Sequence, residues 1–405
     1  MIIHGDVAFM IISTVLVSIM TPGLAFFYGG LVERKNSLTM MFYSFIAMGI
    51  VPILWIFGGF SLVFGNDIGG VIGNPLQYFC FNNFTPLINT NYSSTIPFML
   101  FFMYQMMFAI ITAPLMTGAF VNRLTPGGWI GVLVLWMILI YFPVAHWVWG
   151  GGFLAKMGFV DYAGGAVIHI TAGFGCLGGV HFLGRRAKKN AVAPFNVGFV
   201  AIGGALLFFG WFGFNTGGSL TAAGIATIVF TNTGVATATA MITWLIIHLI
   251  IHKRLSFLEL IIGAIAGLAT ITPCSGYVTP LASVFIGIIA ALLCYTCVQL
   301  ERKFCDDTLD VWGVHGVGGF LGTLMVGILA NPLVNNVERG IRQFGIQLLG
   351  SVIIAIYSII VTYLVFFITN KLTTIRVSEE IQDSGLDKAY FQESFSDYYG
   401  MDKKE

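Results

Sequence analysis

Long apolar runs separated by short polar connections follow one another along nearly the whole chain. Each run has about 17 to 32 residues, and a helix of that length, rising about 1.5 Å per residue, crosses a hydrocarbon core about 30 Å thick. The alternating apolar and polar positions of membrane β-strands are absent. The pattern predicts an all-α polytopic membrane protein with eleven transmembrane helices, at roughly 7–32, 38–64, 96–121, 129–149, 162–183, 195–218, 220–251, 256–272, 277–300, 311–330 and 343–369.

Composition and charge agree with a membrane protein. Hydrophobic residues make up 57% of the chain and charged residues 9%, and the mean hydropathy is +0.89, well outside the range of soluble domains. A formal net charge of +1 gives no indication of a nucleic-acid partner. The six cysteines lack the paired spacing of metal ligands, so neither a metal site nor a disulfide framework is predicted.

The lysines and arginines fall almost entirely in alternate connections, which predicts the orientation in the membrane. Only Lys156, Arg339 and Arg342, of 19 basic residues, lie on the side that holds the N-terminus. The other side holds the connections with Arg34, Lys35, Arg123, Arg185, Arg186, Lys188, Lys189, Lys253, Arg254, Arg302 and Lys303, and the basic residues of the tail. Because positive connections stay inside, we expect a multi-pass protein of the cell membrane with its N-terminus outside and its C-terminus in the cytosol.

The spans divide into two sets of five followed by one more. Because five is an odd number, the second set enters the membrane from the opposite side, which predicts an inverted five-helix repeat plus a C-terminal helix. The composition becomes polar and charged after residue 370. We therefore predict a transmembrane domain over 1–370 and a cytosolic regulatory tail over 371–405.

Two segments repeat the same chemistry at the start of two spans. DYAGGAVIHITAG (161–173) and DVWGVHGVGG (310–319) each place an aspartate, glycines and one histidine on spans that enter from opposite sides. His169 and His315 therefore both approach the middle of the membrane. Asp161 and Asp310 have the position of N-caps, which accept backbone N–H groups of the first helical turn.

Two interpretations of these histidines remain open. Either histidine alone could be a core residue bonded to a neighbouring helix, but their duplication favours a shared site, because ionisable groups in a membrane usually face a cavity or a partner. Apolar surroundings favour neutral imidazoles, which suit a small polar molecule better than a permanent ion. Zinc would need a third or fourth ligand, and no Cys or carboxylate has a suitable spacing.

Four aromatic residues stand out by their predicted depth. Trp149, Trp211 and Phe214 lie near the outer ends of their spans, and Phe108 lies about midway along the third span. Ring faces gathered at an outer mouth attract a cation by about 1 to 2 kcal/mol for each desolvated contact. An interfacial aromatic belt is the alternative for Trp149.

Taken together, these residues identify a family resemblance over essentially the full length. The chain resembles the ammonium transporter (Amt/Mep) branch of the Amt/Mep/Rh proteins, and Trp149 favours this branch over the Rh branch. The matching motifs are TPGLAFFYGGLVERKN (21–36), AHWVWGGG (145–152), the segment 161–185, GWFGFN (210–215), TPCSGYV (272–278), VWGVHG (311–316), and a tail with EE and GLD.

The resemblance implies a homotrimer with one pore in each subunit, and a set of site residues. They are the outer ammonium site of Phe108, Trp149, Ser219 and Asp161, the phenylalanine gate of Phe108 and Phe214, the twin histidines His169 and His315, and the pore or structural residues Trp211, Thr272 and Asp310. It implies no cofactor. In prokaryotes it also implies a PII-type signalling protein as a partner at the cytoplasmic mouth.

Two positions depart from the family pattern. A serine often follows the Asn of GWFGFN by three residues, but this chain has Gly218 there and Ser219 next. A hydroxyl sometimes found on the eighth span is replaced by Ile262. We therefore expect the polar part of the outer site to differ more from the family pattern than its aromatic part.

The resulting hypothesis is a transporter and not an enzyme. It recruits NH4+ outside, deprotonates it near Phe108 and Phe214, and conducts NH3 past the histidines, which either relay the proton or leave transport electroneutral. A sensor that signals through its tail is the second class, although the tail is short. A membrane-embedded hydrolase ranks last, because no nucleophile is predicted beside the histidines.

Overall fold

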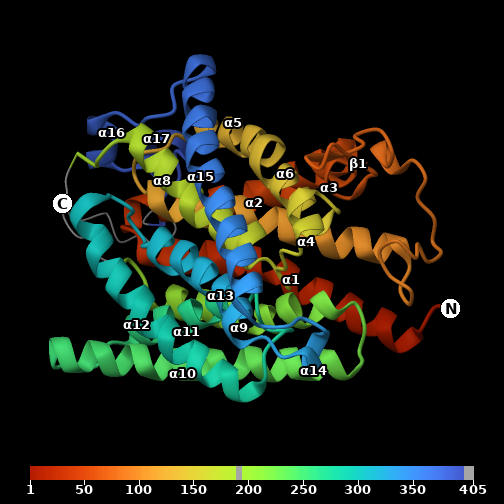
Figure 1. The fold of residues 1–405 in the computed structure, drawn as a ribbon. Helices are drawn as coiled ribbons and strands as arrows, with labels where there is room; N and C mark the ends of the chain where they lie inside the picture. Colours follow the sequence, from red (N-terminus) through yellow and green to blue (C-terminus); the bar gives the residue numbers. More distant parts are fainter. Residues whose placement is uncertain (188–193, 396–405) are drawn as a thin grey trace.

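The computed structural model describes residues 1–187 and 194–395, which form a bundle of long helices (Figure 1). Within these residues, ten helical runs are long and apolar enough to cross a membrane. Four of these runs are single helices: α1 (His4–Leu31), α10 (Gly224–His252), α12 (Pro280–Phe304) and α15 (Ile341–Leu372). Two runs join four elements each: η1 (Arg34–Asn36), α2 (Ser37–Leu54), η2 (Trp55–Gly59) and α3 (Phe60–Phe64) form one, and α5 (Pro126–Trp136), η5 (Met137–Tyr141), α6 (Phe142–Trp149) and α7 (Phe153–Met157) form the other. The remaining four join two elements each: α4 (Phe98–Leu115) with η4 (Met116–Phe120), η6 (Gly165–Ile170) with α8 (Thr171–Leu183), α9 (Val197–Thr216) with η7 (Gly217–Ser219), and η8 (Trp312–Gly316) with α13 (Val317–Leu329).

The eighth predicted span, 256–272, is a shorter apolar helix. α11 (Phe257–Ile271) has 15 residues and packs against α10, α12 and α13. The all-helical, multi-span class predicted from the sequence is confirmed. The count of eleven crossings stays a prediction, because α11 is shorter than a usual spanning helix.

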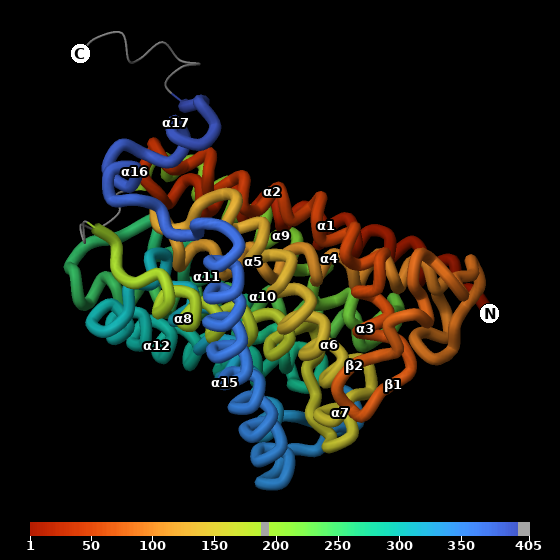
Figure 2. The backbone as a smooth tube through the Cα atoms, turned by 90° about the horizontal axis from the view of Figure 1, so that it is seen from above, coloured from red at the N-terminus to blue at the C-terminus, as the bar shows by residue number. Residues whose placement is uncertain are grey.

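The long helices end at two opposite faces of the bundle (Figure 2). The hairpin face holds the N-terminus, the antiparallel pair β1 (Asp67–Ile68) and β2 (Ile72–Gly73), η3 (Phe79–Phe81) and α14 (Pro332–Asn335). The tail face holds α16 (Glu379–Ser384) and α17 (Leu386–Phe391). Lys188, Lys189 and the last part of the predicted tail, 396–405, lie outside the described residues.

Local sequence explains where several long helices begin. The side-chain oxygens of Thr125, Asn196, Ser256 and Thr279 each accept a hydrogen bond from the backbone N–H three residues later. Proline follows two of these caps, at the first helical position, where a missing N–H costs nothing. These caps satisfy backbone donors that would otherwise be left without partners at the helix ends.

The two histidine-bearing spans cross with their backbones almost touching. A Cβ on Gly173 would lie 2.2 Å from the backbone nitrogen of Gly316, and a Cβ on Gly319 would lie 2.5 Å from the carbonyl oxygen of Gly165. Reciprocally, α8 contacts η8 and α13 contacts η6. Both η6 and η8 are π-helical turns, which are frequent at functional sites. This reciprocal crossing is what an inverted repeat would produce.

The tail folds back onto the tail face and does not extend away from it. The Asp387 carboxylate accepts hydrogen bonds from the backbone N–H groups of Leu38 and Thr39, at the start of α2. The backbone of Val377 donates to the carbonyl of Arg123, in the connection between α4 and α5. The described part of the tail is therefore bonded to connections of the transmembrane region.

We expect Gly173→Ala to lower the free energy of unfolding by about 3 kcal/mol, because the new methyl group would overlap the backbone of Gly316. The control is Gly345→Ala in α15, where a Cβ meets nothing within 4 Å; this change should be neutral or stabilise by less than about 1 kcal/mol. Thermal unfolding of the purified protein in detergent measures both. Equal midpoints for the two variants would contradict the close crossing.

Candidate functional site

A cavity of about 310 Å³ lies at the hairpin face. Its walls come from the end of α3, the loop at 91–92, α4, the end of α6, the segment 161–163, η7 and Leu220. The residues that line it are Phe64, Asn91, Tyr92, Phe101, Tyr104, Gln105, Phe108, Val148, Trp149, Asp161, Tyr162, Ala163, Gly218 and Leu220. Three residues predicted for the outer site, Phe108, Trp149 and Asp161, are among them.

Aromatic rings form one side of this cavity. Phe108 lies edge-on to Trp149, with ring centroids 6.0 Å apart, and edge-on to Tyr104 at 4.8 Å. The Trp149 indole is fixed by its Nε1–H, which donates to the carbonyl oxygen of Asp161 over 2.9 Å. Ring faces held in this way can attract a cation without forming a fixed ion pair.

The predicted polar groups of the outer site have other bonding partners. The two carboxylate oxygens of Asp161 accept four backbone N–H groups, those of residues 164–167, at 2.7 to 3.0 Å. This is the N-cap role predicted for Asp161, extended over a whole turn. Ser219 does not line the cavity, and its hydroxyl lies 2.7 Å from the carbonyl oxygens of Thr216 and Thr221. Gly218 lines the cavity in its place.

Phe108 and Phe214 close the floor of the cavity. Their ring centroids are 4.5 Å apart, and both side chains are buried. The hydroxyl of Tyr104 donates to the carbonyl oxygen of Phe214 over 2.8 Å, which fixes the end of α9 against α4. The structure therefore brings together the two residues predicted as a gate.

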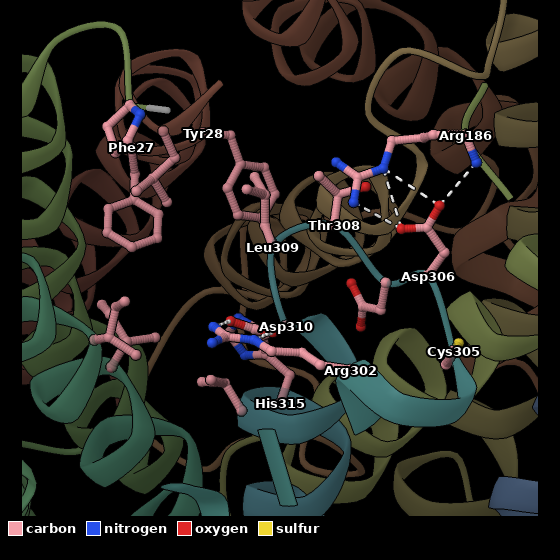
Figure 3. A pocket seen from close by; sticks show the side chains of 16 residues that line it. Phe27, Tyr28, Arg186, Arg302, Cys305, Asp306, Thr308, Leu309, Asp310 and His315 are labelled. Carbon is pink, nitrogen blue, oxygen red and sulfur yellow. Dashed lines mark hydrogen bonds and ion pairs between the residues drawn. The ribbon is translucent and has the colours of Figure 1, made fainter. Parts of the chain in front are cut away.

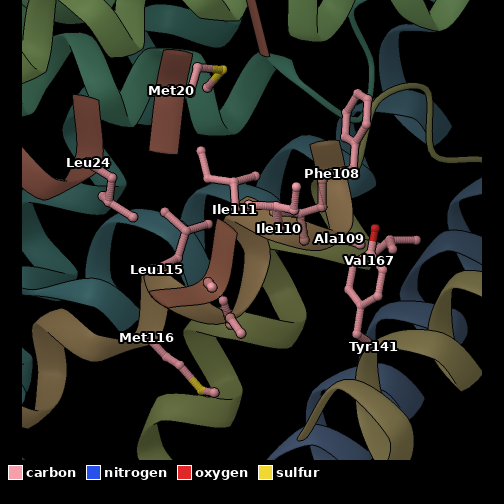
Figure 4. Close-up of a cluster of buried hydrophobic side chains, with 14 of the residues drawn as sticks. Met20, Leu24, Phe108, Ala109, Ile110, Ile111, Leu115, Met116, Tyr141 and Val167 are labelled. Atoms are coloured by element: carbon pink, nitrogen blue, oxygen red, sulfur yellow. The ribbon is translucent and has the colours of Figure 1, made fainter. Parts of the chain in front are cut away.

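Below Phe214 lies a narrow apolar lumen of about 10 Å³, close to the smallest volume that holds one water molecule. Aliphatic side chains of α1 and α4 form much of its wall (Figure 4). The lining residues are Met20, Leu24, Phe27, Ile111, Leu115, Ile168, His169, Leu207, Trp211, Phe214, Ile265 and His315. Among them the only polar side-chain groups are the two imidazoles and the Trp211 indole N–H, and this N–H donates to Thr272 over 2.8 Å.

The two histidines meet inside this lumen. The Nδ1 atoms of His169 and His315 are 3.3 Å apart, and the rings are stacked with an angle of 17° between their planes. One Nδ1 must donate and the other accept, so a neutral pair consists of two different tautomers. Among the described residues, Nε2 of His169 has no hydrogen-bond partner, and the ring stacks on Trp211 at 5.4 Å. The pair can therefore offer one further hydrogen bond to a molecule in the lumen.

A second wide cavity, of about 430 Å³, opens at the tail face (Figure 3). It shares Phe27, Ile265 and His315 with the lumen. Charged side chains surround its mouth: Arg186 pairs with Asp306 at 2.7 Å, and Arg302 pairs with Asp310 at 2.7 Å. The described residues thus hold a wide cavity at each face and a narrow apolar lumen between them, and Phe108 and Phe214 separate the lumen from the cavity at the hairpin face.

The charges at the tail-face cavity influence one another. Burial opposes ionisation of Asp306, but its bonds to Arg186 and the charge of Arg123 outweigh burial and lower the pKa of Asp306. Burial raises the pKa of Asp310 to about 6, despite the opposing effect of Arg302. Asp310 is therefore about half protonated near pH 6 and is mostly ionised at neutral pH.

The prediction that Asp310 caps the span of His315 is wrong. The carboxylate of Asp307 accepts the backbone N–H of Trp312 over 2.7 Å, whereas Asp310 binds Arg302. Asp310 has a positive φ of 57°, and its carboxylate pairs with Arg302 at 2.7 Å. Asp307, three residues earlier, is the acid that takes the N-cap role at this span.

Ile262 lines a different cavity from the one expected. It lines the tail-face cavity, so its replacement of a hydroxyl has no bearing on the cavity at the hairpin face, contrary to expectation. Thr272 lies at the other end of α11 and is fully buried, where its hydroxyl accepts from Trp211 and donates to the carbonyl of Leu268. Thr272, expected as a pore or structural residue, thus supports the Trp211 ring that stacks on His169.

Sequence reasoning missed two residues that shape the path. Tyr104 supports both rings of the gate, and its position one helical turn before Phe108 was the available signal. Asp307 could have been suspected only because three acids, Asp306, Asp307 and Asp310, precede the span of His315. Nothing in the sequence says which of the three turns toward the helix.

Comparison with known proteins agrees with this architecture. A family model described as Ammonium Transporter Family matches residues 8–395 of the chain. The chain is 42% identical over 394 residues to the ammonium transporter of Bacillus subtilis, covering 95% of this chain and 96% of that protein. It is 41% identical over 399 residues to ammonium transporter Amt1 of Archaeoglobus fulgidus, with coverages of 96% and 98%.

Solved structures show the same fold. The crystal structure of Mep2 from Candida albicans superposes with a TM-score of 0.87 at 34% identity, covering 94% of this chain and 87% of that one. A structure described as a sensor Amt protein gives a TM-score of 0.88 at 29% identity, with coverages of 96% and 98%. Fold and site define a multi-pass membrane protein whose helical bundle holds a cavity at each face and a narrow apolar lumen between them. The chain belongs to the Ammonium Transporter Family, as the sequence resemblance predicted.

We expect Asp161→Asn to lower the free energy of unfolding by about 3 kcal/mol or more, because an amide leaves buried N–H groups of the first turn without acceptors. Asp310→Asn should cost less than about 1 kcal/mol at neutral pH, since its arginine partner is half exposed. Thermal unfolding in detergent compares the two variants. A larger loss for Asp310→Asn would contradict the assignment of the helix-start role to Asp161 and Asp307.

Proposed function

We propose that this protein transports ammonium: it recruits NH4+ in the cavity at the hairpin face, deprotonates it at Phe108 and Phe214, and conducts NH3 through the lumen. The observation that carries the proposal is the sequence of spaces along the path. A cavity of about 310 Å³ leads to a lumen of about 10 Å³ that contains two imidazoles, and then to a cavity of about 430 Å³. The membership in the family and the names of the relatives support the choice of substrate.

Recruitment of the cation depends on the aromatic wall. Phe108, Trp149 and Tyr104 present rings to the cavity, and such contacts are worth about 0.5 to 2 kcal/mol each as the cation loses water. The carboxylate of Asp161 is committed to backbone N–H groups, so its contribution is to hold the segment that bonds Trp149. Binding is therefore weak enough to release the ion toward the gate.

The lumen selects against ions that cannot lose a proton. A space of about 10 Å³ cannot contain a hydrated cation, and an ion without its water shell would pay a large desolvation cost in aliphatic surroundings. Ammonium is a weak acid and avoids this cost by giving up one proton to become neutral ammonia. Potassium has no proton to give.

The histidine pair gives the neutral molecule its polar partner inside the lumen. Ammonia can accept or donate hydrogen bonds, and Nε2 of His169 has no hydrogen-bond partner in the part of the chain that the structure describes. The proton released at the gate has two routes: it returns to the outer solution, or it passes along the bonded imidazoles to the tail face. Net current accompanies transport only in the second case.

The family resemblance extends the proposal to the assembly and its regulation. We propose a homotrimer in the cell membrane with the hairpin face outside, because most basic connections belong to the tail face. The tail would regulate transport, since it is bonded to the connections around α2 and α5. A PII-type signalling protein would bind over the cavity at the tail face.

A sensing role is the second candidate, and the likeness to a sensor Amt protein favours keeping it. A sensor would bind ammonium in the same cavity, transport little of it, and pass the signal through the tail. Transport assays on the purified protein distinguish the two roles.

Proteoliposomes that contain the protein should carry current with ammonium, and less with methylammonium, but none with potassium. If the imidazoles relay the proton, His169→Ala and His315→Ala should each lower the ammonium current by about tenfold or more, comparable to the loss of one general acid–base group. Unchanged currents with intact selectivity in both variants would remove the relay. Ammonium binding without any transport would favour the sensor.

Native mass spectrometry of the purified protein tests the assembly, and we expect the mass of three chains. Purification from the native cells under nitrogen excess should bring a PII-type protein with it, and Asp387→Ala, which frees the tail from α2, should change its yield. A monomeric mass would contradict the homotrimer. The absence of any PII-type protein under nitrogen excess would contradict the partner.

A further inference from the structure

A further cavity, of about 530 Å³, shares no lining residue with the lumen or with the cavities at the two faces. We call it the lateral groove. Its lining residues belong to α8, η8, α12, α13 and α15. They are apolar except for the thiol of Cys297 and the indole N–H of Trp312. The lateral groove therefore offers almost nothing to an ion or to a polar solute.

The lateral groove has an exposed rim and a buried floor. On the rim, Leu293 of α12 is 43% exposed and Ile356 of α15 is 53% exposed. On the floor, Leu321 of α13 and Ala355 of α15 are 9% and 5% exposed. Since α13 packs against both α12 and α15, the lateral groove is a hollow over α13 that opens on the surface of the bundle.

The position of the lining residues along their spans places the lateral groove within the membrane. Cys297 and Leu293 come 7 and 11 residues before Phe304, the last residue of α12. At about 1.5 Å per residue they lie roughly 10 and 16 Å from the tail-face end of this helix, inside a hydrocarbon core about 30 Å thick. Because this depth holds no water, the hollow is available to lipid chains or to the apolar side chains of another protein.

Part of the wall of the lateral groove belongs to the crossing of the two histidine-bearing spans. Phe174 follows Gly173, and Val317 follows Gly316, and these are the two glycines whose backbones almost touch. The ring centroid of Phe174 is 6.2 Å from that of Trp312, which lines the groove from η8. A molecule in the lateral groove would therefore contact both spans from outside the lumen.

A positive charge without an ion pair lies at the tail-face end of the same helix. Lys303 is in the last turn of α12, six residues or about 9 Å beyond Cys297. Its side chain is exposed and pairs with no acid among the described residues. Phe304 is 60% exposed, and its ring centroid is 6.1 Å from that of Trp312. Apolar surface therefore continues from the lateral groove toward the end of the helix that carries this charge.

We propose that the lateral groove binds one acyl chain of an anionic phospholipid from the leaflet at the tail face, with the lipid phosphate at Lys303 and the chain against Trp312. A lysine at the end of a membrane helix extends its ammonium group to the level of the lipid headgroups, where anionic phosphates attract it. The apolar hollow and the free charge thus match the two ends of one molecule. The site is separate from the ammonium cavity, so the proposal does not rest on the proposed function.

Native mass spectrometry of the purified protein, titrated with phosphatidylglycerol or phosphatidylcholine, counts the bound lipids and gives their dissociation constants. We expect one phospholipid for each chain to bind more tightly than all further lipids. At this site phosphatidylglycerol should bind about fivefold more tightly than phosphatidylcholine, the effect of one lysine near an anionic headgroup. A protein without any such tight site would overturn the proposal.

Ile356→Trp and Ile360→Trp are a matched pair of variants on α15. The two isoleucines are 53% and 54% exposed, but only Ile356 lines the lateral groove. An indole at position 356 should obstruct the groove and weaken the tight site about tenfold or more, the equivalent of about two buried methylene groups lost. Ile360→Trp should leave the affinity unchanged. Equal affinities in the two variants would overturn the proposal, and a loss of subunits in Ile356→Trp alone would overturn it in favour of a second copy of the chain in the groove.

Lys303→Gln tests the headgroup end of the site. It should lower the affinity for phosphatidylglycerol about fivefold, to that for phosphatidylcholine. The control is Lys253→Gln, which removes an exposed lysine at the end of α10, a helix that does not line the lateral groove. Lys253→Gln should keep the preference for the anionic lipid. An unchanged preference in Lys303→Gln would overturn the proposal.

Fluorescence in bilayers tests the contact with the histidine-bearing span. Bromine atoms on an acyl chain quench indole fluorescence on contact, and the difference between the unmodified protein and Trp312→Phe isolates the signal of Trp312. We expect a small fraction of brominated phosphatidylglycerol in a phosphatidylcholine bilayer to quench this signal about twofold or more strongly than brominated phosphatidylcholine at the same fraction. Equal quenching by the two lipids would overturn the proposal. This measurement does not need the variant that obstructs the groove, so it decides the question even if Ile356→Trp fails to fold.

Discussion

The crossing of the two histidine-bearing spans is the contact on which the rest of the structure depends. Their backbones approach at Gly173 and Gly316 and again at Gly165 and Gly319, at distances that leave no room for a side chain. Two spans that enter from opposite faces must meet this closely for a pair of imidazoles to bond to each other. Small residues make such approaches feasible in a bundle within lipid, where water exclusion does not drive helices together.

The close crossing also constrains the starts of the two spans, which both begin with π-helical turns. Each span needs acceptors for the N–H groups of its first turn, and buried carboxylates provide them. Asp161 serves four such groups at one face, and Asp307 serves the first turn of η8 at the other. The carboxylates are therefore part of the architecture that fixes the histidines, and the space between the faces is left to apolar side chains and two imidazoles.

The cavity at the hairpin face is supported by segments that are distant in sequence. Tyr104 holds Phe214, the backbone of Asp161 holds Trp149, and the bond between His146 and Asp67 holds the turn beside Trp149. A cation site built from ring faces depends on such supports, because the rings themselves provide no directional bonds. Its geometry therefore responds to groups that never touch the substrate.

The sequence by itself determined the class of protein, the position of nearly every span, the family, and the segments that hold the histidines and the outer rings. Hydrophobic runs, basic connections and local motifs are properties of neighbouring residues, and they survive whatever the chain packs against. Only the tertiary structure decided that Asp307 and not Asp310 begins the span of His315, that Ile262 faces the tail-side cavity, and that His146 reaches across to Asp67. Each of these depends on the direction in which one side chain leaves a turn and on which distant segment it meets, and the spacing of residues along a chain contains neither.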